Sequence, residues 1–190
     1  MKNLFVLSLL FLSLTAQAQT SIGIESHIYP AGVIPSIRYD LGITENLTFN
    51  SRIGYKFTNR SDWGKRDNEE GRGFGFGLGF EQTNFLAENL SLNFRTDLWF
   101  MNIDWYEERI FDCPENANCA PYLSGTGSTD VLVLQPSLGF AYQFPVSKQF
   151  FFKPSLSFGY EINVHTEGEE VGGGAILLLG VQFGYFPFAK

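Results

Sequence analysis

The stretch GFGFGLGFE, residues 73–81, alternates between glycine and a bulky apolar side chain. Successive side chains of a β-strand point to opposite faces, so such a strand has one bare face and one face covered with Phe and Leu. A nucleotide-binding loop would need a strand before its glycines and a helix after them, and neither is indicated here. The stretch therefore predicts a β-strand with two very different faces.

The same period of two runs through the rest of the chain and predicts eight strands in all. The clearest segments after 73–81 are 131–144, 150–165 and 172–186, and the weaker ones are 21–29, 33–42, 47–58 and 90–100. Each segment puts large apolar residues on one face and Gly, Ser, Asn and a few charges on the other. Ile176 and Leu178 are exceptions on the polar face of the last segment. Most segments have a length of about 9–14 residues, which is typical of strands that cross a bilayer at a tilt.

Composition narrows the class of protein. The chain has 190 residues, which suits one domain, and it contains 20 Phe and 20 Gly. A helical bundle would be richer in Ala, Leu, Glu and Lys, and a disordered chain would be poorer in apolar residues. The formal net charge is −7, from 13 basic and 20 acidic residues, which argues against a nucleic-acid partner held by a basic face.

The first 18 residues have the three parts of a secretory signal peptide. Lys2 supplies the positive charge, Leu4 to Leu14 is an apolar run, and Ala16-Gln17-Ala18 matches a cleavage site. The apolar run is too short for a membrane-spanning helix. We therefore expect a signal peptide at residues 1–18 and a barrel domain at residues 19–190.

The strands can close into a barrel in two ways. A soluble, lipocalin-like barrel turns its apolar face inward, but an eight-stranded interior has no room for about forty bulky apolar residues. Those residues must then face outward, into lipid, and an open sheet edge in hydrocarbon is too costly to persist. The expected fold is all-β, an eight-stranded antiparallel up-and-down transmembrane β-barrel.

The connections between the strands alternate in length. Residues 44–46, 87–89 and 146–148 are short turns, whereas 59–72, 110–130 and 165–171 are longer and polar; the first connection, 30–32, is short. In outer-membrane barrels, short turns face the periplasm and longer loops face outside. Seven aromatic residues lie toward strand ends and are expected to form interfacial girdles: Tyr29, Tyr39, Tyr55, Trp99, Tyr142, Tyr160 and Tyr185.

This pattern of strands and turns resembles the small eight-stranded outer-membrane β-barrel family, the OmpA- and OmpX-like transmembrane barrels. The resemblance covers nearly the whole mature chain. It implies a place in the outer membrane of a Gram-negative envelope, contact with outer-membrane lipid and lipopolysaccharide, and insertion by the barrel-assembly machinery. The family has a C-terminal aromatic residue that this machinery reads. Phe188 is the nearest equivalent, with Tyr185 and Phe186 as alternatives.

Ten charged residues fall on the polar, inward face of the expected strands. Buried charges must be paired, and five acids and five bases allow complete pairing. One interpretation is a salt-bridged plug that keeps the barrel closed, and the other is a charged, water-filled pathway for small solutes. The ten residues are Glu25, Arg38, Asp40, Arg52, Lys56, Glu81, Arg95, Asp97, Lys153 and Glu161.

Cys113 and Cys119 are the only cysteines, and they lie in the loop-like stretch 111–130. Two nearby cysteines in an exported chain predict a disulfide. Asp112 and Glu115 alone do not complete a set of metal ligands, so no metal site and no cofactor are expected.

Catalysis by such a barrel would need a histidine with a nucleophile or an acid near the outer leaflet. His165 lies beside Thr166 and Glu167, but the spacing matches no nucleophile–base motif, so no catalytic residue is assigned. The last outer loop is acidic, with Glu167, Glu169 and Glu170, and can attract divalent cations that bridge lipopolysaccharide phosphates or can simply be solvated. Further aromatic contact points on the outer loops are Trp63, Trp105, Tyr106 and Tyr122.

The sequence thus predicts an integral outer-membrane barrel, closed or nearly closed and without catalysis. Its expected role is structural, adhesive or surface-binding through the outer loops, and no surface ligand follows from the residues. Two other classes of function remain as alternatives: a small-solute channel of the porin kind, and a lipid-modifying enzyme that depends on His165.

Overall fold

The computed structural model describes residues 20–61, 68–110 and 122–187, with the backbone alone at 107–110 and 122–124. The expected signal peptide, the cysteine pair, Trp63 and Phe188 lie outside the described residues. The strands are β1 (Thr20–Tyr29), β2 (Gly32–Gly42), β3 (Leu47–Ser61), β4 (Asn68–Gln82), β5 (Leu90–Ile110), β6 (Tyr122–Tyr142), β7 (Phe144–Pro145), β8 (Phe150–Glu167) and β9 (Gly174–Tyr185). Within these ranges no helix is long and apolar enough to cross a membrane.

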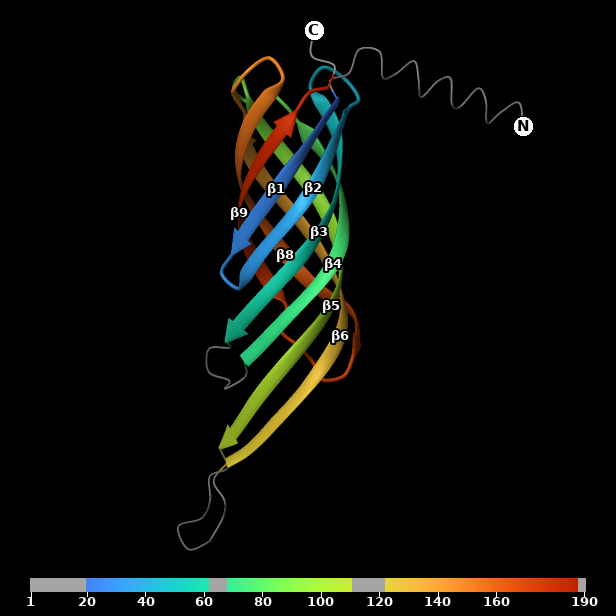
Figure 1. Cartoon of the computed structure of the whole chain (residues 1–190), viewed down its shortest axis with the longest axis vertical. Coiled ribbons are helices and arrows are strands. Elements are labelled where there is room, and N and C mark those ends of the chain that lie inside the picture. Colours follow the sequence, from blue (N-terminus) through green and yellow to red (C-terminus); the bar gives the residue numbers. More distant parts are fainter. Residues whose placement is uncertain (1–19, 62–67, 111–121, 188–190) are drawn as a thin grey trace, which may run out of the picture.

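The strands form a closed ring (Figure 1). Neighbours in sequence pair antiparallel from β1 to β6, β6 then pairs with β8, β8 with β9, and β9 with β1. The two residues of β7 follow β6 after Gln143 and pair with β8, so they prolong β6 rather than add a wall. Eight long strands therefore make an antiparallel up-and-down barrel, as the alternation predicts.

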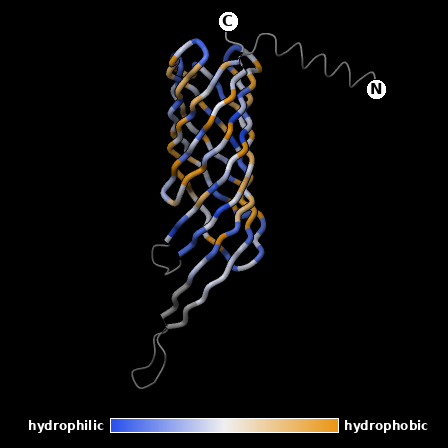
Figure 2. Tube along the Cα trace, viewed as in Figure 1, coloured by the Kyte–Doolittle hydropathy of each residue, from blue (hydrophilic) through white to orange (hydrophobic). Residues whose placement is uncertain are grey.

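The two faces of the wall differ as sharply as the sequence indicates. Within the wall of the barrel, apolar and polar residues alternate along the strands (Figure 2). On the outward face, Phe74 and Ile53 are 61% and 72% exposed. On the inward face, Arg52 and Asp97 are 2% and 0% exposed. The soluble, lipocalin-like alternative is therefore wrong, because the charges line the interior and the large apolar side chains cover the exterior.

The two ends of the barrel are different. The described chain begins and ends at the same end, which also carries the connections 43–46, 83–89 and 146–149 (Figure 1). We call it the turn end and the opposite end the loop end. The connection from β4 to β5 is longer than the turn predicted at 87–89, and Asn84, Leu86 and Asn89 adopt left-handed backbone angles, with φ of 54°, 63° and 63°.

At the loop end the strands extend further than predicted. Much of the expected loops 59–72 and 110–130 is strand, because β3 pairs with β4 as far as Ser61–Asn68 and β5 pairs with β6 as far as Ile110–Tyr122. Outside a membrane both faces of a strand can be polar, so the hydropathy pattern that marks the other strands disappears here. The β5–β6 hairpin consequently projects beyond the rest of the barrel (Figure 1).

The girdle prediction is wrong for two of the seven aromatic residues. Trp99 has the same strand parity as Asp97 and is fully buried inside the barrel. Tyr29 has the parity of His27, and its hydroxyl donates a hydrogen bond of 2.9 Å to the Phe57 carbonyl oxygen. Position near a strand end does not decide the face, whereas parity does. The remaining five lie on the outward parity: Tyr39, Tyr55, Tyr142 and Tyr160 are exposed and Tyr185 is half-buried.

Candidate functional site in the barrel lumen

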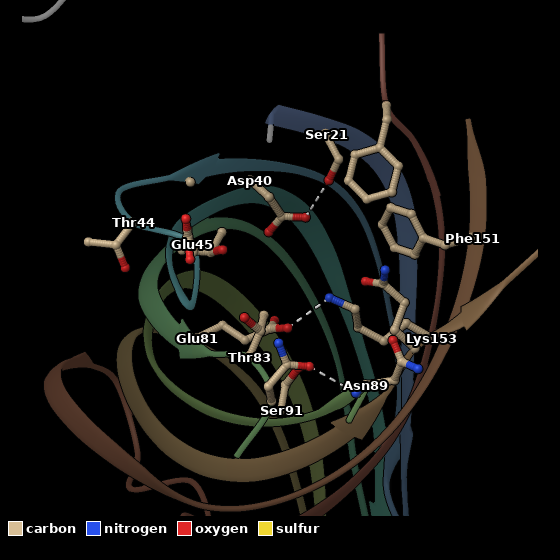
Figure 3. Close-up of a pocket in the computed structure, with 15 residues that line it drawn as sticks. Ser21, Asp40, Thr44, Glu45, Glu81, Thr83, Asn89, Ser91, Phe151 and Lys153 are labelled. Atoms are coloured by element: carbon tan, nitrogen blue, oxygen red, sulfur yellow. Dashed lines mark hydrogen bonds and ion pairs between the residues drawn. The ribbon is translucent and has the colours of Figure 1, made fainter. Parts of the chain in front are cut away.

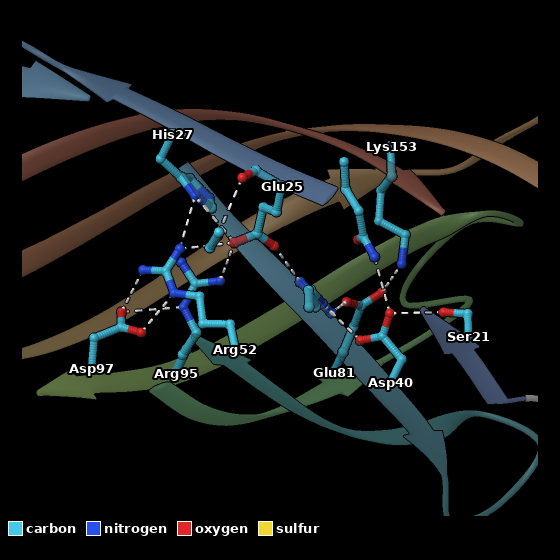
Figure 4. Close-up of polar contacts among 12 residues, drawn as sticks. Ser21, Glu25, His27, Asp40, Arg52, Glu81, Arg95, Asp97 and Lys153 are labelled. Atoms are coloured by element: carbon cyan, nitrogen blue, oxygen red, sulfur yellow. Dashed lines mark hydrogen bonds and ion pairs between the residues drawn. The ribbon is translucent and has the colours of Figure 1, made fainter. Parts of the chain in front are cut away.

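Among the described residues, the lumen gathers charged side chains from many strands. The structure places all ten charged candidates there, and Figure 4 shows the part of this set around Glu25 and Glu81. Four acids and four bases form one connected set of ion pairs, which we call the charge network: Glu25, Arg38, Asp40, Arg52, Glu81, Arg95, Asp97 and Lys153. Equal numbers of acids and bases leave the network without formal net charge.

Glu25 on β1 is the centre of the network. One of its oxygens accepts from Arg52 Nη1 at 2.8 Å and Arg95 Nη1 at 2.9 Å, and the other accepts from Arg38 Nη1 at 3.0 Å. His27 lies one inward position further along β1, with Nδ1 3.2 Å from the same Glu25 oxygen. His27 is not among the ten predicted residues, although its inward parity is visible in the sequence.

Two further acids complete the middle of the network. Arg52 makes a two-pronged contact with Asp97, at 2.8 Å from both Nε and Nη2, and Arg95 Nε reaches Asp97 at 3.2 Å. Such paired, charge-assisted hydrogen bonds fix the guanidinium plane as well as its position. The two arginines are thereby held between Glu25 and Asp97.

The network continues toward the turn end through Arg38. Its Nε donates to Asp40 at 2.7 Å and its Nη2 donates to Glu81 at 2.6 Å, while Lys153 Nζ donates to Glu81 at 2.8 Å. Asp40 also accepts from Ser21 Oγ at 2.9 Å. Every charge in this part therefore has an opposite charge as a direct partner.

Lys56 and Glu161 form a separate ion pair, in which Lys56 also donates to the Gln135 side chain at 3.1 Å. The Lys56 ammonium lies over the ring of Tyr29, 5.3 Å from its centroid. This pair is not joined to the eight-membered network by any ion pair among the described residues.

The glycine face of β4 makes room for the network. A Cβ at Gly77 would overlap the Asp97 carboxylate, and a Cβ at Gly75 would overlap the Trp99 ring. The neighbouring strand β5 thus places large side chains over the bare face of β4. This close approach explains why glycine alternates so strictly in residues 73–79.

A polar pocket of about 360 Å³ opens at the turn end (Figure 3). Asp40, Glu81 and Lys153 line it, together with Ser91 and Phe151. Because the first three residues belong to the charge network, the network closes the inner side of the pocket.

Apolar side chains fill most of the loop-end half of the lumen, beside the Lys56–Glu161 pair. The strand pattern does not predict this cluster as a whole, although Ile176 and Leu178 stand out on the polar face of their segment. Its buried members are Ile34, Trp99, Met101, Ile103, Val131, Val133, Val171, Ile176 and Leu178. Arg52 marks the boundary with the charge network, because its guanidinium carbon lies 5.4 Å from the centroid of the Trp99 ring.

The segment between β8 and β9, residues 168–173, folds into the mouth of the barrel at the loop end. It carries Val171 into the apolar cluster, where this side chain is buried. The Val171 carbonyl accepts from the Asn163 side chain at 2.8 Å. Gly168 begins the segment and Gly174 follows it, with φ of 126° and 132°, backbone conformations that residues with a side chain rarely adopt.

An ion pair on β3 and β4 holds this segment in place. The Gly172 amide donates to Glu69 Oε1 at 2.9 Å, and Arg60 Nη2 donates to the Gly172 carbonyl at 2.7 Å. Arg60 and Glu69 are themselves paired, with Arg60 Nε donating to Glu69 Oε2 at 2.9 Å. The segment that covers the loop-end mouth is therefore held by hydrogen bonds to both the amide and the carbonyl of Gly172.

His165 lies outside the lumen on β8. Its imidazole is largely exposed, with Nε2 3.2 Å from Glu167 Oε1. Among the hydrogen bonds of the described residues, Glu167 is its partner. In the same part of the chain, no group of three or more His, Cys, Asp and Glu side chains is placed to hold a metal ion.

Comparison with solved structures places this geometry among known proteins. A major outer membrane protein from Thermus thermophilus matches with a TM-score of 0.52 at 12% identity, over 87% of this chain and 98% of that one. The chain has the fold of the small outer-membrane β-barrels. This barrel is also similar to Ail, the attachment invasion locus protein of Yersinia pestis, with a TM-score of 0.48 at 11% identity over 88% of this chain and 97% of that one.

The N-terminal β-barrel domain of Pseudomonas aeruginosa OprF matches with a TM-score of 0.41 at 15% identity, over 88% of this chain and 99% of that one. No protein-family profile matches the sequence, and no curated protein matches it either. The likeness is therefore one of fold.

Proposed function

We propose that this barrel is a non-conducting outer-membrane protein that acts through its outer surface, as an anchor for an adhesive or surface-binding hairpin. The observation that carries this proposal is the filled lumen. The charge network, the apolar cluster and the inward-folded segment 168–173 follow one another from the turn end to the loop end. Such a lumen supports a closed barrel better than a pathway for solutes.

The long β5–β6 hairpin supports a surface role. β6 pairs with β8 only as far as Asp130, whereas its pairing with β5 continues from Asp130 to Tyr122. A paired two-stranded ladder that projects at the loop end is suited to contact molecules outside the membrane. In this orientation the turn end faces the periplasm, the wall contacts lipid and lipopolysaccharide, and the barrel-assembly machinery inserts the chain.

Location and closure can be tested together. The protein should fractionate with the outer membrane and should migrate differently in detergent gels before and after boiling. In planar bilayers the purified protein should give no conductance above the lipid baseline. Stable single-channel steps in bilayers would support the channel alternative instead.

The surface role needs a variant that leaves the barrel intact. Replacing residues 107–125 by an Asn-Gly turn would remove the projecting ladder while keeping the β5–β6 pairing within the barrel. Cells that carry this variant should lose cell-to-cell aggregation and adherence to the level of cells without the protein. Unchanged aggregation and adherence, with equal amounts of folded barrel, would reject the hairpin as the binding element.

A further inference from the structure

The outward face of β1 is a trough in the wall of the barrel. Its floor is made by Ile22, Ile24 and Ser26, which lie opposite the larger Tyr185, Phe183 and Val181 of β9. Two grooves of about 630 Å³ each occupy this trough, and Ile24, Ile37 and Phe183 line both of them. The two grooves are therefore parts of one continuous apolar channel. This channel is a groove on the outer, lipid-facing side of β1 and is separate from the lumen.

The channel begins at the turn end. Its first part is lined by Val146 and Phe150, which flank the turn between β6 and β8. Its second part reaches Tyr55 and Val181. The floor from Ile22 to Ser26 is about 13 Å long at the usual rise per residue of a strand. This length matches one leaflet, since a leaflet contributes about half of a hydrocarbon core of about 30 Å.

The mouth of the channel carries groups that suit a lipid headgroup. Ile22 pairs with Tyr39 on one side and with Tyr185 on the other, so two phenol rings flank the mouth. Tyrosines of this kind sit at membrane–water interfaces, with the ring in the apolar layer and the hydroxyl in the polar one.

Val146 and Phe150 line the first part of the channel, and Lys148 lies at the tip of the turn between them. Ser147 shapes the turn, because its hydroxyl oxygen accepts from the backbone amides of Gln149 at 3.2 Å and Phe150 at 3.1 Å. The other two short turns carry the acids Glu45 and Glu88, so Lys148 is the basic side chain of the described turns. An anionic headgroup is therefore favoured at this turn and disfavoured at the others.

We propose that this channel binds one anionic phospholipid of the periplasmic leaflet. One acyl chain lies in the trough over Ile22, Ile24 and Ser26, and the phosphate lies beside Lys148. The inference rests on the orientation given under the proposed function, and it adds a lipid partner at the turn end. Charge near a membrane surface contributes enough per lysine to favour phosphatidylglycerol over a neutral lipid by about fivefold.

Native mass spectrometry of the protein purified in detergent tests the headgroup. With equal amounts of phosphatidylglycerol and phosphatidylcholine of identical acyl chains, the barrel should retain one phosphatidylglycerol preferentially. Lys148→Gln should lower that retention about fivefold and leave phosphatidylcholine unchanged. Glu88→Gln, a change in another short turn, is the matched control and should leave both values unchanged. Equal retention of the two lipids by the unaltered protein would overturn the proposal.

A second variant tests the trough. Ile24→Phe fills it and should remove retention of both lipids, whereas Leu78→Phe, which adds the same ring to the lipid-facing side of β4, should change neither. Unchanged retention in a folded Ile24→Phe barrel would also overturn the proposal. A stable dimer that Ile24→Phe dissociates would assign the trough to a second copy of the chain instead. If Ile24→Phe fails to show heat-modifiable migration, Lys148→Gln decides the outcome.

These readouts are separate from those of the proposed function. Conductance and adherence report on the lumen and on the β5–β6 hairpin, whereas lipid retention reports on the outward face of β1. If the unaltered barrel is closed and adhesive but shows no lipid selectivity, the lipid site alone is rejected. Failure of outer-membrane fractionation would reject the orientation on which the lipid site depends.

Discussion

The same strands enclose both halves of the lumen, but different kinds of interaction between side chains fill them. In the turn-end half, Glu25 is shared by three arginines, and each charge has a direct partner. In the loop-end half, Trp99, Leu178 and Val171 belong to an apolar cluster, and the separate Lys56–Glu161 ion pair lies beside it. Ion pairs away from water depend on every partner, because one removed charge leaves another uncompensated. Apolar packing instead changes in proportion to the volume removed.

The two halves also differ in what they hold: one fixes the strands of the wall, and the other closes the mouth of the lumen. The charge network ties together β1, β2, β3, β4, β5 and β8 through side chains, so it can fix the relative positions of these strands. The apolar cluster includes Val171 from a connecting segment, so it can be opened without unfolding the wall. We therefore expect changes in the first half to act on the whole barrel and changes at the mouth to act locally.

The largest effect is expected from Arg95→Ala. This change leaves Glu25 and Asp97 with one cation fewer and should lower the free energy of unfolding by about 3–5 kcal/mol. Urea unfolding of the barrel in lipid vesicles, followed by tryptophan fluorescence, measures it. Arg72→Ala on the exposed outward face of β4 is the control and should stay within about 0.5 kcal/mol. Equal, negligible losses for both would show that the lumen is hydrated and that the network does not act as a plug.

A smaller effect is expected from Leu178→Ala in the apolar cluster. Leu178 is fully buried, and its truncation leaves a cavity that should lower the free energy of unfolding by about 2–4 kcal/mol. Leu177→Ala is the matched control one residue away, since its side chain faces lipid and the acyl chains can fill the space. A loss for Leu177→Ala as large as that for Leu178→Ala would contradict a packed loop-end half.

Glu69→Ala should act on the inward-folded segment alone. It removes the acceptor of the Gly172 amide and the partner of Arg60, a hydrogen bond to a charged group of about 1.5 kcal/mol. Hydrogen exchange of the Gly172 amide should therefore become about tenfold faster, with unchanged unfolding of the barrel. Glu70→Ala, the exposed neighbour on the opposite face, should leave this exchange rate as it is. A barrel that unfolds early in the Glu69→Ala variant would show that the segment supports the wall.

The smallest effect on the barrel is expected from the predicted disulfide between Cys113 and Cys119, outside both halves of the lumen. Closing so short a loop contributes about 2 kcal/mol in the chain-closure model, and that contribution is local. Reduction should raise protease sensitivity between residues 111 and 130 and leave heat-modifiable migration unchanged. Free thiols at both positions in protein taken from the cell surface would reject the disulfide.

Strand period and strand parity were accessible from the sequence. The alternation in segments such as 73–81 predicts the strands and their faces, and the ten inward charges follow from parity alone. Even the two misplaced aromatics, Tyr29 and Trp99, obey parity. Hydropathy could not mark the strand residues 122–130, since water on both faces of the hairpin removes the contrast on which the pattern depends.

Only the tertiary structure decided which charges meet and what fills the rest of the lumen. Glu25 and Arg95 are 70 residues apart in sequence, and their contact depends on the register of every strand between them and on the bare glycine face of β4. The place of Val171 inside the mouth depends on Arg60 and Glu69, which lie on two other strands. A sequence specifies the face of each side chain through local backbone geometry, which repeats every two residues. Its partners are specified by closure of the ring, and closure is a property of all eight strands together.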